Sequence, residues 1–181
     1  MYGVGGVGIN AVQGARYAGA KNVVAIDPLE FKLEMAQTVG ATHVATSHEE
    51  AKELVITLTR GQLADHAIIT ADLATAELLR QAVEIIGKAS DVVVTSVADY
   101  DEPSLHMSSG PLTGWQKRIQ GALFGACNPL YDIPKVLGLY RSGDLKIQEL
   151  ITNRYRLDQV NQGYEDLLSG RNIRGVIIHE H

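Results

Sequence analysis

The chain has 181 residues, a formal net charge of −5 at pH 7 and a single cysteine, Cys127. This length suits one ordinary domain, or one domain with part of a second. The acidic balance argues against nucleic acid as the main partner, the lone cysteine excludes a disulfide framework, and no apolar run approaches the ~20 residues of a membrane span. We therefore expect a cytoplasmic protein that binds neither nucleic acid nor membrane.

A glycine-rich turn opens the chain. The residues Gly3-Val4-Gly5-Gly6-Val7-Gly8 match the pattern G-x-G-x-x-G, and only Met1 and Tyr2 precede them. Such a turn joins a first buried strand to a first helix, and the strand would need about five residues before the turn. We therefore predict a truncated first strand, in a chain that is one piece of a larger protein.

The context of this turn decides its interpretation, because a glycine hexapeptide alone is weak evidence for a ligand. Residues 9–18 are rich in alanine and end at Gly19, which predicts a helix. Residues 23–26 are a continuous apolar run, which predicts a buried strand ending at Asp27, nineteen residues beyond Gly8. Strand, acid and spacing indicate a dinucleotide-binding site. The plain alternative is a glycine turn followed by a surface aspartate.

Each glycine has a physical role in such a site. Gly3 allows the tight exit from the first strand, and Gly8 lets helix and strand pack closely. Gly5 and Gly6, with Val7 beside them, let a pyrophosphate approach the backbone at the helix N-terminus. The helix macrodipole favours an anion there by about 0.3–1 kcal/mol.

Asp27 predicts which dinucleotide is bound. Its carboxylate would accept hydrogen bonds from the hydroxyls of the adenosine ribose. A carboxylate repels a 2′-phosphate, and Pro28 follows it where an arginine could have bound one. The sequence therefore favours NAD over NADP.

Beyond Asp27, strand and helix signals alternate, which is the pattern of an α/β, doubly wound parallel (Rossmann) sheet. We expect helices over residues 29–39, 49–60 and 75–86, and strands over 43–45, 66–70 and 91–95. Residues 98–114 should form a long connection. A last strand over 119–125 and a helix over 134–142 then complete an NAD-binding domain, residues 1–147.

The tail from residue 148 to residue 181 has its own pattern. We expect a strand over 151–157, a helix over 158–168 with Asp158 as its N-cap, and a strand over 176–178. This tail is too small to form a core of its own. We therefore assign it to the C-terminal remnant of a second domain.

Several segments carry a resemblance to a known family. They are residues 3–8, the Val-Ala-Ile-Asp27 strand, and residues 39–42, 121–125 and 168–175. Together they resemble the C-terminal, NAD-binding half of a zinc-dependent alcohol dehydrogenase of the medium-chain dehydrogenase/reductase family, over nearly the whole chain. Residues 128–134 further resemble the branch that includes nicotinoproteins, which hold their NAD tightly.

The resemblance implies roles for three charged residues. Asp27 matches the acid that binds the adenosine ribose, and Lys32 matches a lysine that helps to hold the same sugar. Arg174 matches an arginine that reaches back from the other domain to the pyrophosphate. Ordinary surface charge is the alternative for Lys32 and Arg174.

The resemblance also implies backbone contacts along the cofactor. Thr70 and Ala71 would lie beside the adenosine, although the chain departs from the family at the next position, where Asp72 stands in place of a frequent glycine. Positions expected to meet the nicotinamide carboxamide are Val97, Ala122 and Phe124. The family further implies a homodimer in which residues 119–125 of two subunits pair edge to edge.

By this resemblance the complete enzyme transfers hydride between an alcohol and the nicotinamide, with zinc polarising the oxygen. The zinc ligands and the proton relay of the family lie in its N-terminal half, so we assign this chain no catalytic residue and no metal site. We expect Cys127 to be a buried small residue, and His179 and His181 to be exposed at the C-terminus. The chain alone should bind the cofactor without turnover.

Two other classes stay open. A non-catalytic nucleotide-binding or oligomerisation module would also lack the zinc half. A methyltransferase combines a glycine-rich turn with an acid that binds ribose, so S-adenosylmethionine is the other conceivable ligand. The pyrophosphate-type glycine spacing and Arg174 argue against the methyltransferase.

Overall fold

A computed structural model describes residues 1–96 and 107–179. The helices are α1 (Gly8–Tyr17), α2 (Glu30–Thr38), α3 (His48–Thr59), α4 (Ala76–Ile85), α5 (Ser109–Gly114), α6 (Pro129–Ser142) and α7 (Val160–Leu168). The strands are β1 (Val24–Ile26), β2 (His43–Ala45), β3 (Ala64–Ile69), β4 (Ile86–Val94), β5 (Arg118–Gly121), β6 (Ile151–Arg156) and β7 (Arg174–Ile178). Short 3₁₀ turns are η1 (Leu123–Ala126), η2 (Gln148–Leu150) and η3 (Leu157–Gln159).

The main sheet is parallel, and Tyr2 joins its two parts. β1 pairs with β2, and β3, β4 and β5 pair in that order. Tyr2 forms parallel bridges to Ile26 on one side and Ile69 on the other, and the amide of Gly3 donates to the carbonyl of Ile26 at 2.8 Å. The spatial order is therefore β2, β1, Tyr2, β3, β4, β5, with the first residues in the place of a central strand. This arrangement is Rossmann-like.

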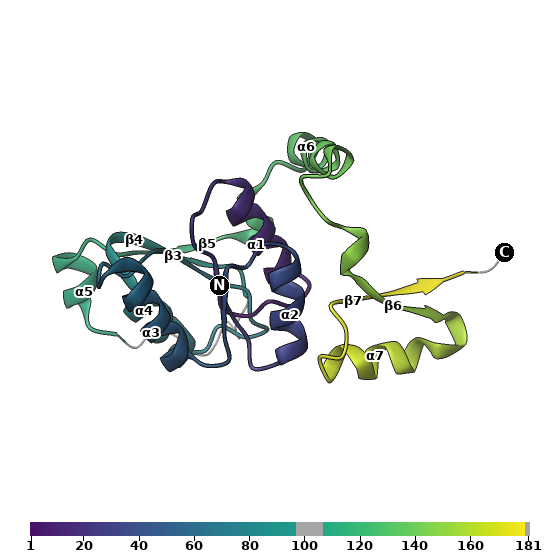
Figure 1. The fold of residues 1–181 in the computed structure, drawn as a ribbon, viewed down its shortest axis with the longest axis horizontal. Coiled ribbons are helices and arrows are strands. Elements are labelled where there is room, and N and C mark those ends of the chain that lie inside the picture. Colours follow the sequence, from purple (N-terminus) through teal and green to yellow (C-terminus); the bar gives the residue numbers. More distant parts are fainter. Residues whose placement is uncertain (97–106, 180–181) are drawn as a thin grey trace.

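Helices cover both faces of this sheet (Figure 1). One core cluster lies between the sheet and the helices α3 and α4, and contains Val55, Ile69 and Ile86. The other lies under α1 and α2 and contains Val4 and Ile9. Burial of apolar surface on both faces explains the apolar runs of the inner strands, at residues 24–26, 67–69 and 92–94.

Two of the predicted helices, α3 and α4, begin at side-chain caps. Ser47 accepts a hydrogen bond from the amide of Glu50 at the start of α3, at 3.2 Å. Thr75 does the same for the amide of Leu78 at the start of α4, also at 3.2 Å. These caps satisfy amides that the helix itself leaves unpaired, and they confirm the predicted helix starts to within one or two residues.

The C-terminal segment forms a small β-α-β unit beside α2 (Figure 1). β6 and β7 are parallel and are connected by η3 and α7. Leu150 and Ile173 of this segment are buried in the same core cluster as Val4 and Ile9. The boundary between residues 147 and 148 stays a prediction.

The predicted last strand is wrong in its second half. β5 ends at Gly121, and the chain turns through η1, where Phe124 (φ 48°) and Gly125 (φ 69°) adopt left-handed backbone conformations. This conformation cannot continue a strand. Leu123 therefore lies outside the sheet ladder.

Two predicted helix starts are also wrong. α6 begins at Pro129 rather than at residue 134, so Pro129 occupies the first turn, where a missing amide costs little, and Pro134 lies inside the helix. Asp158 is not the N-cap of α7, whose N-cap is Gln159. The Asp158 carboxylate, in η3, instead pairs with the guanidinium of Arg156, the last residue of β6.

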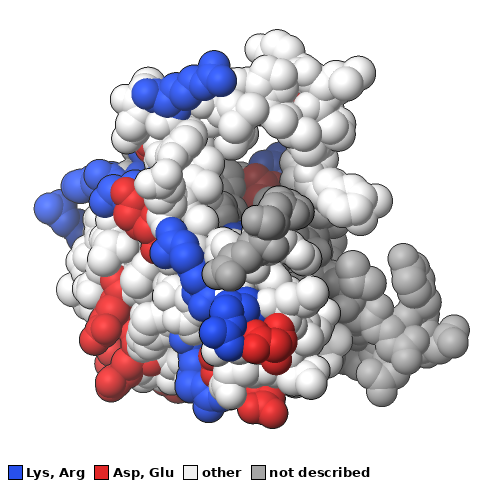
Figure 2. All heavy atoms as spheres, turned by 90° about the vertical axis from the view of Figure 1, so that its right-hand side faces the viewer, with Lys and Arg blue, Asp and Glu red and all other residues white. Residues whose placement is uncertain are grey.

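An exposed apolar surface covers α6, which buries none of its residues. Figure 2 shows this part of the molecule, at the top, as mostly uncharged, while Lys and Arg lie among Asp and Glu below it. The large apolar residues exposed on α6 and η1 are Leu123, Phe124, Leu130, Tyr131, Ile133, Val136 and Leu137. We refer to these seven residues as the α6 surface.

Candidate functional site

The first and last glycines of the turn are fixed by close packing. Gly3 has a φ of +81°, and a Cβ there would lie 2.7 Å from the amide nitrogen of Ala71. A Cβ on Gly8 would overlap the carbonyl oxygen of Gly3 and the hydroxyl of Thr70. Both positions therefore require glycine for the turn to pack against the end of β3.

The two middle glycines face cationic side chains instead. The protein atom nearest to a Cβ on Gly5 would be the Nζ of Lys32, at 4.0 Å. A Cβ on Gly6 would meet the carbonyl oxygen of Ile173 at 3.3 Å and the Nη2 of Arg174 at 3.5 Å. The turn therefore brings the first amides of α1 together with two positive charges, which is an environment that suits an anion.

Asp27 is buried at the end of β1, with 5% of its surface exposed. Its Oδ2 accepts a hydrogen bond from the amide of Val4 at 3.0 Å, and its Oδ1 accepts one from the amide of Leu29 at 3.1 Å. These bonds tie the acid to the glycine turn and fix its orientation. Each carboxylate oxygen has a second acceptor direction that a ligand hydroxyl can use.

Thr70 and Ala71 lie against the turn from the side of β3. The hydroxyl of Thr70 donates to the carbonyl of Gly3 at 2.5 Å, and its amide donates to the carbonyl of Tyr2 at 2.8 Å. Asp72, which follows them, is exposed. In this geometry the hydroxyl of Thr70 holds the turn in place.

The residues predicted to contact the nicotinamide do not form one cluster in the described part of the chain. Ala122 continues from β5, and its amide donates to the carbonyl of Val94 at 2.9 Å. Phe124 lies in η1 and is 84% exposed. Val97 lies outside the described residues.

A hollow of about 550 Å³ lies next to Asp27. Its lining residues come from the start of α2 and from the turn after α7: Pro28, Leu29, Glu30, Phe31, Ser169, Gly170 and Arg171. Gly170 packs so closely on Leu29 that a Cβ would overlap that side chain. Arg171 is not among the residues predicted to contact the cofactor, although the motif over residues 168–175 contains it.

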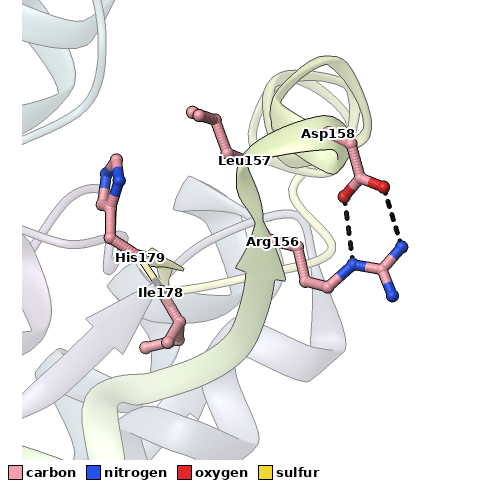
Figure 3. A pocket seen from close by; sticks show the side chains of 5 residues that line it. All are labelled: Arg156, Leu157, Asp158, Ile178 and His179. Carbon is pink, nitrogen blue, oxygen red and sulfur yellow. Dashed lines mark hydrogen bonds and ion pairs between the residues drawn. The ribbon is translucent and has the colours of Figure 1, made fainter. Parts of the chain in front are cut away.

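A second hollow, of about 490 Å³, lies at the carboxyl ends of β6 and β7. Figure 3 shows Arg156 and Asp158 paired there through two hydrogen bonds, at 3.1 and 2.8 Å, with Ile178 and His179 nearby. His179 is exposed, as predicted. This hollow contains none of the predicted cofactor-binding residues.

The described residues do not fit a zinc ion. In residues 1–96 and 107–179, no three His, Cys, Asp or Glu side chains come together in a way that could hold a metal. Cys127 is exposed, so its expected burial is wrong, because η1 and the start of α6 lie on the surface. Within the same ranges, the helices are too short or too polar to cross a membrane.

Comparison with known proteins agrees with this geometry. Residues 6–142 match the model of a family described as zinc-binding dehydrogenase. The chain belongs to this family. An NDMA-dependent alcohol dehydrogenase from Amycolatopsis methanolica is 49% identical over 179 residues, which are 99% of this chain and 48% of that protein. Alcohol dehydrogenase B from Mycobacterium tuberculosis is 40% identical over 177 residues, or 98% of this chain and 47% of that protein.

Solved structures of dehydrogenases share the fold. An alcohol dehydrogenase zinc-binding domain protein from Burkholderia ambifaria superposes with a TM-score of 0.89 at 27% identity, covering 99% of this chain and 48% of that one. Benzyl alcohol dehydrogenase from Acinetobacter calcoaceticus gives 0.88 at 26% identity, covering 97% and 48%. The chain spans about half the length of the curated relatives it matches, and corresponds to their C-terminal half.

Proposed function

We propose that this chain is the NAD-binding part of a zinc-dependent alcohol dehydrogenase. The observation that carries the proposal is the position of Asp27, a buried carboxylate hydrogen-bonded to the glycine turn. Lys32 and Arg174 lie at the middle glycines of the same turn. An acid and a lysine for the ribose hydroxyls, beside an arginine for the phosphates, form the arrangement that an adenine dinucleotide needs.

The chain's own residues would bind and orient the cofactor. Asp27 accepts hydrogen bonds from the adenosine ribose, with Lys32 beside the same sugar. Gly5, Gly6 and the N-terminus of α1 receive the pyrophosphate, with Arg174 as counter-charge. When bound, NAD supplies the hydride acceptor or donor for interconversion of an alcohol and a carbonyl compound.

The alcohol substrate and the zinc chemistry belong to the complete enzyme in this proposal. The described side chains do not fit zinc, so no catalytic step is assigned to them. From composition alone, we also propose a cytoplasmic location.

A binding experiment tests the proposal. The isolated chain is first denatured, and the released nucleotide is identified by chromatography, because residues 128–134 resemble a branch that holds NAD tightly. The chain is then refolded without nucleotide and titrated with NADH, NADPH and S-adenosylmethionine. We expect NADH to bind most tightly. Tighter binding of S-adenosylmethionine would replace the proposal with a methyltransferase-type site. Binding of none of the three would favour the oligomerisation module.

We further propose a homodimer formed through β5 and the α6 surface. Among the described strands, β5 pairs only with β4, so its other edge carries backbone groups that a second copy could pair. The α6 surface adjoins this edge in the chain and contains seven exposed large apolar residues. A two-fold contact would cover both features with the same surface on each copy.

A further inference from the structure

A buried tyrosine lies at the centre of the C-terminal β-α-β unit. Tyr155 of β6 is 7% exposed, and its ring lies against two glycines. A Cβ on Gly163 of α7 would meet the ring at 3.3 Å, and one on Gly175 of β7 would meet it at 2.7 Å. The missing side chains at these two positions create the space for the tyrosine, so its ring links α7 to β7.

The hydroxyl of Tyr155 uses all of its hydrogen-bonding capacity. It donates to Oδ2 of Asp166 at 2.7 Å, and accepts from the side-chain amides of Asn153 at 2.9 Å and Asn172 at 3.2 Å. The Asp166 carboxylate also accepts from Arg171 at 2.8 Å. The bond from Tyr155, followed by that from Arg171, lowers the pKa of Asp166. The acid therefore remains an acceptor at neutral pH.

Asn172 connects this cluster to the cofactor-binding turn. It is 3% exposed and immediately precedes Ile173 and Arg174. The amide of Ile173 donates to the hydroxyl of Thr152 at 3.0 Å, and the Ile173 side chain lies in the core cluster under α1. The Nη2 of Arg174 lies 3.5 Å from the carbonyl oxygen of Gly6. The segment that carries Arg174 is thus held by the tyrosine cluster on one side and by the glycine turn on the other.

We propose that Tyr155, through its hydrogen bonds to Asp166 and Asn172, is a positioning residue that sets Arg174 for the pyrophosphate. This inference rests on the proposed function. To that function it adds a residue outside the cofactor site, Tyr155, whose loss would weaken cofactor binding through Arg174. Among the described residues, the hydroxyl of Tyr155 bonds to Asn153, Asp166 and Asn172, not to the glycine turn or Asp27.

Amide hydrogen exchange tests the positioning without a ligand. In Tyr155→Phe the ring volume is kept and the hydroxyl is lost, so the amide of Ile173 should exchange about three- to tenfold faster, as expected within one hydrogen-bond network. The amide of Thr70, bonded to Tyr2 in the main sheet, should be unchanged. Tyr164→Phe is the matched control, because Tyr164 lies on α7, the helix that carries Asp166, and its side chain is exposed. Unchanged exchange at Ile173 would overturn the inference.

Ligand binding tests the route through Arg174. Tyr155→Phe should weaken binding of NADH about three- to tenfold and leave that of 5′-AMP, which lacks a pyrophosphate, within about twofold. In an Arg174→Ala background, Tyr155→Phe should have no further effect on NADH. Full additivity of the two substitutions, or equal losses for NADH and 5′-AMP, would contradict the inference.

A second variant guards against a folding defect. Asn172→Ala leaves the bond between Tyr155 and Asp166 intact and removes only the link to the Arg174 segment, so it should reproduce the selective loss of NADH binding. If the unmodified chain fails to bind NADH, the proposed function fails, while the exchange experiment still decides the role of Tyr155. If the unmodified chain binds and neither variant alters binding or exchange, the inference alone is wrong.

Discussion

At the scale of single residues, Asp27 carries the predicted choice of cofactor. Asp27→Ala removes the charged acceptor for the ribose hydroxyls, so NADH binding should weaken by about 1.5–3 kcal/mol, or roughly 10- to 150-fold. NADPH binding should change much less, because the same substitution relieves repulsion of the 2′-phosphate. Fluorescence titration of both nucleotides measures the ratio.

A control separates binding from folding, because Asp27 also accepts hydrogen bonds from the amides of Val4 and Leu29. Asp27→Asn keeps the shape and one acceptor oxygen, so it should preserve the turn better than Asp27→Ala while still lowering the preference for NADH. If both variants still prefer NADH, another group must recognise the ribose hydroxyls.

At the scale of elements, the buried Lys117 caps the C-terminal end of α4. The Nζ of Lys117 donates to the carbonyl of Val83 at 2.6 Å and lies 4.8 Å from the centre of the Trp115 ring. Lys117→Met removes this donor and leaves a carbonyl of the last helical turn unpaired, so the free energy of unfolding should fall by about 1–3 kcal/mol. Lys88→Met, at an exposed position of β4, should change it little. Urea titration of both variants measures these free energies of unfolding.

The pH dependence of this effect has a definite sign. Burial lowers the pKa of Lys117 below its ordinary value of 10.5. Between the lowered pKa and 10.5 the unfolded chain binds more protons than the folded protein, so stability rises with pH in this window. The stability difference between the unmodified protein and Lys117→Met should therefore grow toward pH 10.

The helices and strands also show how much of the fold the sequence could predict. Helices α1 to α4 and strands β1 to β3 follow from apolar periodicity and caps, because local chemistry and burial agree there. The sequence did not predict where β5 ends, because residues 119–125 look like one continuous strand. The left-handed conformations of Phe124 and Gly125, which end it, do not alter the apolar pattern. In the candidate site, the spacing predicted that Asp27 would lie beside the glycine turn, and its hydrogen bond from the amide of Val4 places it there; its role in binding stays a prediction. The Tyr155 cluster and Arg171 depend on packing between distant segments, which spacing does not encode.

At the scale of the whole molecule, the proposed dimer can be broken at one residue. Leu130 is 91% exposed on α6. In a dimer through the α6 surface, Leu130→Asp would place a charge in an apolar contact and weaken association roughly 10- to 150-fold, from the ~1.5–3 kcal/mol of a buried leucine. Leu168→Asp is the control, because Leu168 is similarly exposed on α7, away from this surface. Light scattering at tens of micromolar should show a dimer for the unmodified chain and the control only.

The last prediction concerns catalysis by the chain as a whole. In the proposed complete enzyme a zinc ion polarises the alcohol oxygen, and the described residues offer no set of His, Cys, Asp or Glu side chains that could hold one. Added zinc cannot replace absent ligands. We therefore expect NADH binding without oxidation of simple alcohols, with or without zinc, in chain of verified full mass and compared with a boiled sample. Turnover above that control would mean that this chain forms a catalytic site by itself. It would contradict the proposal that this half binds the cofactor and the other half holds the zinc.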